Sequence, residues 1–296
     1  MSKQIILVTG ANGQLGSELQ AISINYPEYD FLFVTRAELP IDNAELLREY
    51  FFQHAVTACI NCAAYTAVDK AETETELAFA VNGEAVGRLA AICKVHDVVF
   101  IHISTDYVFN GNADSPYQTD HPTDPVNSYG ASKLKGEELA LQHNEYSIII
   151  RTSWVYSSFG NNFVKTMLRL MKDRESINVV NDQWGRPTYA ADLAAAIMRV
   201  LQKKIYDGKQ FSGLYHFSNS GMPITWYDFA TAIKMLSASK CEVNPISSAA
   251  YPTPAKRPQY SVLDTIDLEN DFELHIPEWR ESLKKCLAIL TADREK

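Results

Sequence analysis

The chain has 296 residues, 46% of them hydrophobic and 21% charged, which is the composition of a globular protein with a substantial core. Its formal net charge of −9 argues against a nucleic-acid-binding protein, which needs a basic surface. Residues 1–10 run directly into a polar glycine turn, so we expect neither a signal peptide nor a membrane span. The five cysteines suit reduced thiols, and the expected location is the cytoplasm.

Strand-like and helical runs alternate through the first half of the chain. Apolar, β-branched runs predict strands at residues 4–10, 30–36, 56–64, 98–104 and 146–156. Helical runs follow them at residues 13–23, 43–54, 76–96, 131–143 and 161–172. This order predicts an α/β fold with a Rossmann-like, doubly wound parallel sheet and helices on both faces. Ligands of such sheets bind beyond the carboxyl ends of the strands.

The second half of the chain is less regular. Proline-rich turns appear at residues 221–226 and 251–260, and they predict a smaller, irregular α/β lobe. A helix and a strand within residues 189–220 are expected to return to the first sheet. The predicted first domain is therefore residues 1–151 plus about 189–220. The predicted second lobe consists of residues from about 152 to 188 and of residues 221–296.

A glycine turn follows the first predicted strand and opens the first predicted helix. Gly10, Gly13 and Gly16 are spaced as GxxGxxG. Glycines let the backbone approach a pyrophosphate, and the helix N-terminus offers it free N–H donors. This strand–turn–helix setting predicts dinucleotide binding. The expected cofactor contacts here are Gly10, Asn12, Gly13, Gln14, Leu15 and Gly16.

The second predicted strand ends at Arg36, 20 residues beyond Gly16. An NAD-dependent enzyme usually has an acid near this position for the ribose 2′-hydroxyl, whereas an arginine suits a 2′-phosphate. We therefore expect NADPH, with NADH as the alternative; an ordinary surface arginine is the other interpretation. Asp42 has two candidate roles, near the adenine or as the cap of the next helix.

Two further motifs carry reactive side chains. Thr105, Asp106 and Tyr107 follow a strand that reads as fully buried, so they predict a ligand-facing surface. Tyr129 and Lys133 lie four residues apart at a predicted helix start, with Ser128 as a candidate cap, and so share one helix face. A lysine ammonium at ~4 Å would lower the pKa of the tyrosine from ~10 and make it a proton donor near neutral pH. The alternative is an exposed ion pair between Lys133 and Glu137.

The motifs "TGANGQLG", "STDYVF" and "YGASK" together resemble the extended short-chain dehydrogenase/reductases. Within that superfamily, "NCAAYTAVDKAE", "RTSWVYSSFGNNFV", "DQWGRPTYAADLA" and "KRPQYSVLD" resemble, in the same order, segments of the dTDP-4-dehydrorhamnose reductase family. The resemblance covers nearly the whole chain. It implies NADPH-dependent reduction of the 4-keto group of dTDP-4-dehydro-6-deoxy-L-mannose to dTDP-L-rhamnose.

The resemblance also implies roles for individual residues. Thr105 would hydrogen-bond the sugar carbonyl oxygen, Tyr129 would protonate it, and Lys133 would hold the nicotinamide ribose. The second lobe would bind the sugar nucleotide. Further cofactor contacts are implied at Ala63, Ala64, Tyr65 and Asn82, and substrate contacts at Val68, Asp106, Tyr107 and Trp154. Because a diphosphate needs charged donors, we also predict that Arg257, in the clearest basic pair of the second lobe, contacts the substrate.

The chain departs from the family pattern at two places. Asn110 replaces an expected aspartate after "YVF". Some relatives bind magnesium through carboxylates at a subunit contact; Glu18 matches one, but Ala190 and Ala191 stand where another acid is needed, so no obligatory metal site of that kind is expected.

Two rival functions stay open. One is a nucleotide-sugar dehydratase or epimerase of the same fold, and the other is a non-catalytic NADP-binding regulatory subunit. The expected partner is a small-molecule nucleotide sugar, without nucleic acid or membrane, and the expected state is a monomer or homodimer.

Overall fold

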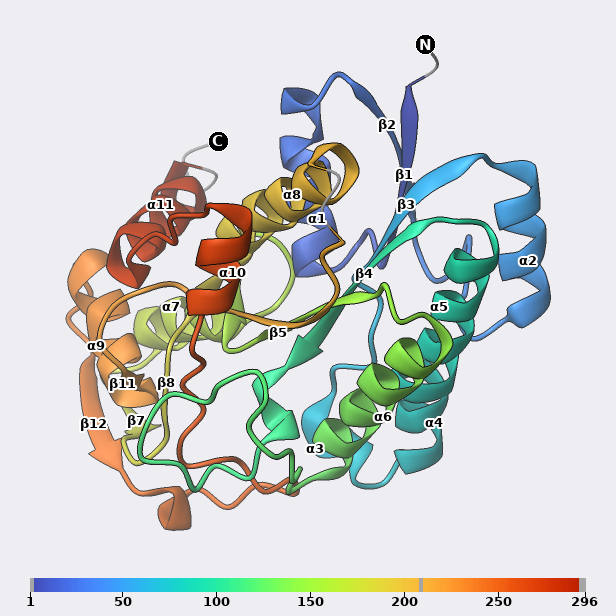
Figure 1. The fold of residues 1–296 in the computed structure, drawn as a ribbon. Helices are drawn as coiled ribbons and strands as arrows, with labels where there is room; N and C mark the ends of the chain where they lie inside the picture. Colours follow the sequence, from blue (N-terminus) through green and yellow to red (C-terminus); the bar gives the residue numbers. More distant parts are fainter. Residues whose placement is uncertain (1–2, 208–209, 293–296) are drawn as a thin grey trace.

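The computed structural model describes residues 3–207 and 210–292, and a six-stranded parallel sheet lies at its centre (Figure 1). The strands follow the order β10-β5-β4-β3-β1-β2. They are β1 (Gln4–Thr9), β2 (Tyr29–Val34), β3 (Val56–Asn61), β4 (Val99–Thr105), β5 (Ile148–Thr152) and β10 (Gly213–Phe217). The predicted doubly wound fold is confirmed. The direction of winding reverses beside β1, so a ligand crevice is expected where β1 and β3 end.

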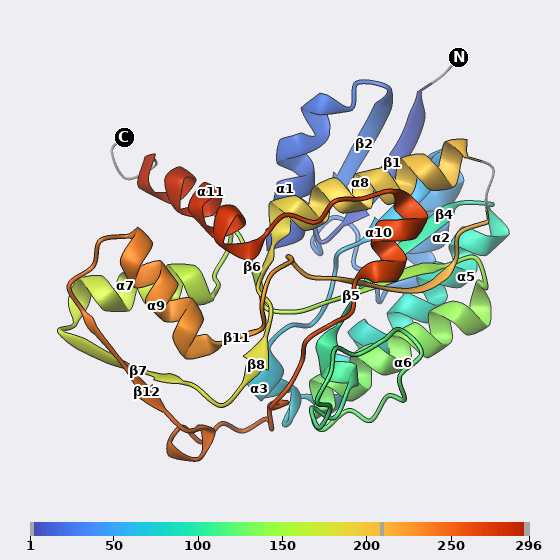
Figure 2. The same cartoon turned by 60° about the vertical axis from the view of Figure 1, so that its left-hand side comes forward.

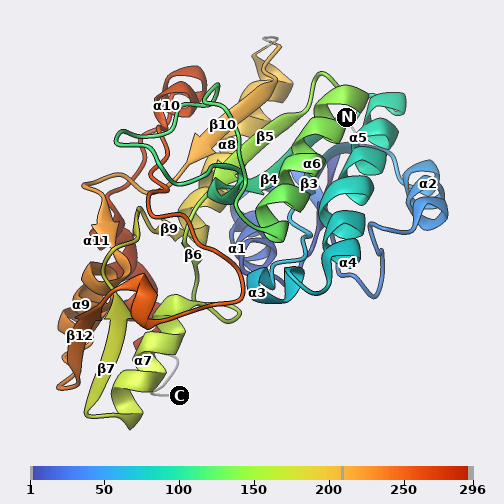
Figure 3. The same cartoon turned by 90° about the horizontal axis from the view of Figure 1, so that it is seen from below.

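Helices cover both faces of this sheet (Figure 3). The helices α2 (Ala44–Gln53), α5 (Ala85–Val95) and α6 (Ser128–His143) pack on one face, and α1 (Gln14–Ile22) and α8 (Ala190–Tyr206) on the other. Strand side chains alternate between the two layers. Ile148 and Ile150 of β5, for example, join the core under α8, whereas Ile149 joins the core under α5. The continuous apolar runs of the sequence therefore reflect burial on both faces.

The second lobe is built from helices and short strand pairs, at the left of Figure 2. Its helices are α7 (Phe163–Asp173), α9 (Trp226–Leu236) and α11 (Trp279–Ala292). The strand pairs are β6 (Val155–Tyr156) with β9 (Thr188–Tyr189), β7 (Ser176–Val180) with β12 (Glu242–Ile246), and β8 (Trp184–Gly185) with β11 (Ile224–Thr225). Since two-stranded pairs are marginal alone, a separate core around Tyr156, Phe229 and Trp279 stabilises the lobe.

One segment that we expected in the second lobe packs elsewhere. Helix α10 (Ile266–Phe272) lies against β10 and α8, and Leu268, Phe272 and Ile276 belong to the core of the first sheet. The phenyl ring of Phe272 meets the Tyr215 ring edge-on at 5.0 Å. The lobe boundary at residues 221–296 therefore does not hold for this helix.

Two predicted helix caps are wrong by one residue. Asn43, not Asp42, caps α2, because its side chain accepts hydrogen bonds from the N–H groups of Glu45 and Leu46 at 3.1 Å. Asn127, not Ser128, caps α6 by accepting from the Gly130 N–H at 2.8 Å. Both replacements have the same short polar chemistry that favours this position.

The helix predicted over residues 76–96 contains an irregular turn. It consists of α4 (Thr75–Phe79), the π-helical turn η2 (Ala80–Glu84) and α5. Such turns occur often at functional sites. Before this segment the chain forms the short helix α3 (Val68–Ala71), and the short 3₁₀ turns are η1 (Ser23–Asn25), η3 (Asp106–Val108) and η4 (Ser248–Ala250). Within residues 3–207 and 210–292, every helix is too short or too polar to cross a membrane.

Candidate active site

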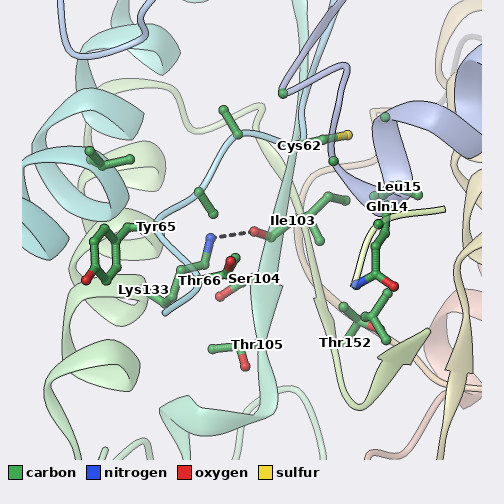
Figure 4. A pocket seen from close by; sticks show the side chains of 18 of the residues that line it. Gln14, Leu15, Cys62, Tyr65, Thr66, Ile103, Ser104, Thr105, Lys133 and Thr152 are labelled. Carbon is green, nitrogen blue, oxygen red and sulfur yellow. Dashed lines mark hydrogen bonds between the residues drawn. The ribbon is translucent and has the colours of Figure 1, made fainter. Parts of the chain in front are cut away.

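A cavity of about 760 Å³ opens at the carboxyl ends of β1, β3 and β4 (Figure 4). Nearly all residues predicted from the sequence to bind cofactor or substrate line it; Asn82 and Arg257 are the two that do not. The lining includes Gly10, Asn12, Gly13, Gln14, Leu15, Gly16, Arg36, Asp42, Ala63, Ala64, Tyr65, Val68, Thr105, Asp106, Tyr107, Tyr129, Lys133 and Trp154. The glycine turn and the motifs around Thr105 and Tyr129 therefore lie on one cavity.

Gly10 and Gly16 of the glycine turn have no room for a side chain. Gly10 has a φ of +68°, and a Cβ atom there would lie 2.7 Å from the backbone nitrogen of Ala63. A Cβ atom on Gly16 would collide with the carbonyl oxygen of Gly10. Helix α1 begins directly after this turn, without a side-chain cap and without an acid in its first turn. Its free N–H groups therefore fit a pyrophosphate.

Arg36 and Asp42 lie together on the same cavity. The Arg36 side chain is 70% exposed, and its Nη2 atom lies 3.5 Å from Oδ2 of Asp42. At this exposure the ion pair contributes little, so an incoming phosphate can compete for the guanidinium. The residue set fits a ribose 2′-phosphate because Arg36 offers paired donors.

Tyr129 approaches Thr105 because two elements pack without a side chain between them. Thr105 ends β4, and its Oγ1 accepts from the Tyr107 N–H at 3.2 Å and donates to Oδ1 of Asp106 at 3.0 Å. A Cβ atom on Gly130 would collide with the Tyr107 carbonyl oxygen, so only glycine lets α6 begin this close to η3. The Tyr129 and Tyr107 rings meet edge-to-face at 5.6 Å.

Lys133 is buried, and its partners lie on β4. The Nζ atom donates to the Ile103 carbonyl oxygen at 2.7 Å and lies 3.3 Å from Nε2 of His102 (Figure 4). The alternative pairing with Glu137 is wrong, because Glu137 binds the buried Arg151 at 2.7 Å. Burial lowers the pKa of Lys133 to about 8, although the nearby Glu137 carboxylate opposes this shift.

The pKa of Tyr129 differs in direction from our prediction. Burial raises it to about 12, interaction with the Thr105 hydroxyl opposes the rise, and the Asp106 carboxylate adds to it. Lys133 is not among the groups that shift it, since its ammonium is directed to the Ile103 carbonyl. The prediction that Lys133 lowers the Tyr129 pKa is therefore wrong for this structure. Tyr129 stays protonated at neutral pH and can donate its proton.

Comparison with known proteins identifies the family. The family model described as "RmlD substrate binding domain" matches residues 3–292. The chain belongs to this family. It is 40% identical over 290 residues to the dTDP-4-dehydrorhamnose reductase of Aggregatibacter actinomycetemcomitans, covering 96% of this chain and 98% of that one. The Escherichia coli enzyme of the same name is 39% identical, with 95% and 96% covered.

Solved structures of the RmlD family superpose closely on this chain. A dTDP-4-dehydrorhamnose reductase from Clostridium acetobutylicum has a TM-score of 0.92 at 38% identity, covering 97% of this chain and 100% of that one. The enzyme of that name from Bacillus anthracis, solved in complex with NADP, gives the same values. A dTDP-glucose 4,6-dehydratase from Streptomyces venezuelae, at 17% identity, shares the fold with a TM-score of 0.81.

Asn82 and Arg257 lie outside the cavity lining. Asn82, in the π-helical turn, accepts from the Tyr65 N–H at 2.8 Å and donates to the Tyr65 carbonyl oxygen at 3.0 Å. It therefore holds the loop after β3 in place. Nη2 of Arg257 contacts Oδ2 of Asp69 at 3.1 Å, whereas its Nη1 atom is buried without a partner.

Of the two predicted substrate contacts that follow Thr105, Asp106 is buried and Tyr107 is partly buried. Burial raises the pKa of Asp106 to about 6, while hydrogen bonds from Ser261 and Thr105 oppose the rise. The pKa of Tyr107 is raised by burial and by Asp106, and the Arg257 charge opposes this. Asn110, the departure from the family pattern, accepts from the Asn112 N–H at 3.0 Å and so shapes its own loop.

The sequence predictions missed a loop from the second lobe that reaches the glycine turn. Gly160 and Asn161 line the cavity. The next residue, Asn162, caps α7 and donates through Nδ2 to Oε1 of Gln14 at 2.9 Å. The polar stretch "SSFGNN" was a signal for this loop, but it did not reveal that the loop contacts α1.

Glu18, the candidate magnesium ligand, has a protein partner. It is buried, and it accepts a hydrogen bond from Oγ of Ser157 at 2.6 Å. Burial raises its pKa, and the Asp192 carboxylate adds to the shift. In the described part of the chain, no three His, Cys, Asp or Glu side chains lie close enough to hold a metal ion.

Proposed function

We propose that this chain reduces the 4-keto group of dTDP-4-dehydro-6-deoxy-L-mannose to give dTDP-L-rhamnose, with NADPH as reductant. One observation carries the proposal: Thr105, Tyr129 and Lys133 lie on the same cavity as the glycine turn and Arg36. The names of the relatives and the NADP complex of one of them support it. NADH is the alternative cofactor.

The residues present fit a dinucleotide phosphate. The N-terminus of α1 would hold the pyrophosphate, and Arg36 would hold the 2′-phosphate. The bound cofactor supplies the hydride that reduces the carbonyl carbon. Lys133 is buried in the cavity wall, and its ammonium would donate to a ribose hydroxyl beside its bond to the Ile103 carbonyl oxygen.

The chain supplies the proton and the orientation. Thr105 would donate a hydrogen bond to the carbonyl oxygen in place of its present bond to Asp106. Tyr129 would transfer its phenolic proton to the same oxygen as negative charge develops there. With its pKa raised to about 12, Tyr129 carries this proton throughout the neutral range.

The residue at position 107 distinguishes the proposed reductase from a dehydratase of the same fold. Elimination of water requires an acid/base pair beside the sugar, and the related dehydratases typically have Thr-Asp-Glu where this chain has Thr105-Asp106-Tyr107. A tyrosine has an ordinary pKa of ~10 against ~4 for a glutamate, and burial raises the pKa of Tyr107 further, so Tyr107 stays neutral and cannot supply the carboxylate of such a pair. Reduction needs no second acid.

We also propose that Arg257 binds the diphosphate, since its buried Nη1 donor has no partner.

Tyr129→Phe tests the catalytic assignment. Turnover of NADPH with the 4-keto sugar should fall by a factor of ~10² or more, whereas NADPH binding measured by fluorescence should persist, because only the phenolic proton is lost. Tyr146→Phe, a change at a half-exposed tyrosine remote from the cavity, is the matched control. Full turnover by Tyr129→Phe would remove Tyr129 from the mechanism. NADPH binding without any turnover by the unmodified chain would favour the regulatory subunit.

A further inference from the structure

Trp154 has an uncommon backbone conformation at the junction of the two lobes. It lies between β5 and β6 with a φ of +48°, in the left-handed region that bulky residues rarely adopt. Its carbonyl oxygen accepts from the Thr188 N–H at 3.2 Å, and the residue lines the cavity. Backbone strain of this kind persists only where the surroundings impose it.

Gly185 covers one face of the Trp154 indole. A Cβ atom on Gly185 would lie 2.6 Å from Cε2 of the indole, and 2.8 and 2.9 Å from Cζ2 and Nε1, the two atoms bonded to Cε2 on its outer side. A contact in the ring plane would be nearer to those two atoms than to Cε2. The glycine therefore lies above the ring, and any side chain at position 185 would displace the indole.

Trp226 covers the opposite face. Its ring lies parallel to the Trp154 ring, with centroids 3.6 Å apart and planes at 12°, and Phe163 supports it at 4.6 Å. Two groups at these separations cannot occupy the same side of one indole. The β8–β11 pairing sets Gly185 opposite Ile224, two residues before Trp226, so one strand pair fixes both sides of the sandwich.

A sandwiched indole can offer a ligand only its edge. No hydrogen bond within the described chain involves the Trp154 N–H, and this atom is not among the buried polar atoms that lack a partner. We propose that Gly185 and Trp226 are positioning residues, which hold Trp154 so that its N–H edge, rather than its ring face, meets an oxygen of the sugar nucleotide. This inference rests on the function proposed above and adds a specificity contact to it.

Circular dichroism tests the sandwich without any substrate. Two stacked indoles whose transition moments are skewed in the ring plane give an exciton couplet, which the unmodified chain should show. Trp226→Leu and Gly185→Ala should both abolish it, the first by removing one ring and the second by displacing the other. Trp184→Phe, at a partly exposed neighbouring tryptophan, is the control and should retain it. A couplet that survives Gly185→Ala in a folded variant would overturn the sandwich.

Kinetics test the edge contact. Trp154→Phe keeps an aromatic ring but removes the N–H, so KM for the 4-keto sugar should rise about tenfold, the scale of one hydrogen bond, with kcat and the KM for NADPH retained. Gly185→Ala should have a similar effect, and the double variant should be no worse than Trp154→Phe alone. Additive effects, or an unchanged KM in Trp154→Phe, would overturn the contact. An unmodified chain that shows the couplet but no turnover would instead refute the proposed function.

Discussion

The buried ammonium of Lys133 should make the stability of the chain depend on pH in a defined way. Its pKa falls from 10.5 in the unfolded chain to about 8 in the folded one. A difference of about 2.5 pH units corresponds to about 3 kcal/mol. Below pH 8 Lys133 is protonated in both the folded and the unfolded chain, and the folded state is destabilised by the full free energy of burying this charge. Between pH 8 and 10.5 the unfolded state binds more protons, so the folded state gains stability as pH rises.

Urea unfolding of the unmodified chain and of Lys133→Met, at pH values from 7 to 10, measures this effect. The variant also loses the hydrogen bond to Ile103, but that loss is nearly constant and cancels between pH values. Relative to the variant, the unmodified chain should gain about 2–3 kcal/mol in free energy of unfolding by pH 10. Lys94→Met, at a half-exposed surface ion pair, is the control and should show no such trend. A difference independent of pH would refute the reasoning.

Two further predictions concern charged groups at the cavity and beside it. Arg36→Ala should raise the KM for NADPH by about tenfold and leave the KM for NADH nearly unchanged, because only NADPH has the 2′-phosphate. Steady-state kinetics with each cofactor measure this. Equal effects on the two KM values would make Arg36 an ordinary surface residue. Arg257→Ala should raise the KM for the sugar nucleotide at least tenfold, since a buried diphosphate would lose a charged donor. The control is Arg280→Ala, at another ion-paired arginine of the second lobe, and it should leave this KM unchanged. Unchanged substrate affinity in Arg257→Ala would mean that other groups hold the diphosphate.

Periodicity predicted the sheet and most of its helices because each element carries its own burial pattern. The isoleucines of β5, for example, read as a fully buried strand and occupy both cores. The spacing of Tyr129 and Lys133 likewise placed both side chains on the cavity. Local rules failed where two neighbouring residues have equal chemistry, as at Asn127 and Ser128, and only the backbone geometry selects the cap.

The charge environment of the site could not be predicted from spacing. Lys133 binds the Ile103 carbonyl on another element, so the assumed effect of its ammonium on Tyr129 does not appear. The same applies to α10, whose apolar residues gave no indication of which core they would join. Gly185 lies within the motif "DQWGRPTYAADLA", but its contact with Trp154 depends on the pairing of β8 with β11, which are distant in the sequence.

The most direct test of the account is the stoichiometry and mass of the product. The chain should consume one NADPH per 4-keto sugar, followed by absorbance of the reduced nicotinamide, and mass spectrometry should show a product two mass units heavier than the substrate. This is the balance for addition of a hydride and a proton to a carbonyl, with no water lost. A product eighteen mass units lighter than a supplied dTDP-hexose, formed without net consumption of cofactor, would make the chain a dehydratase and contradict the account.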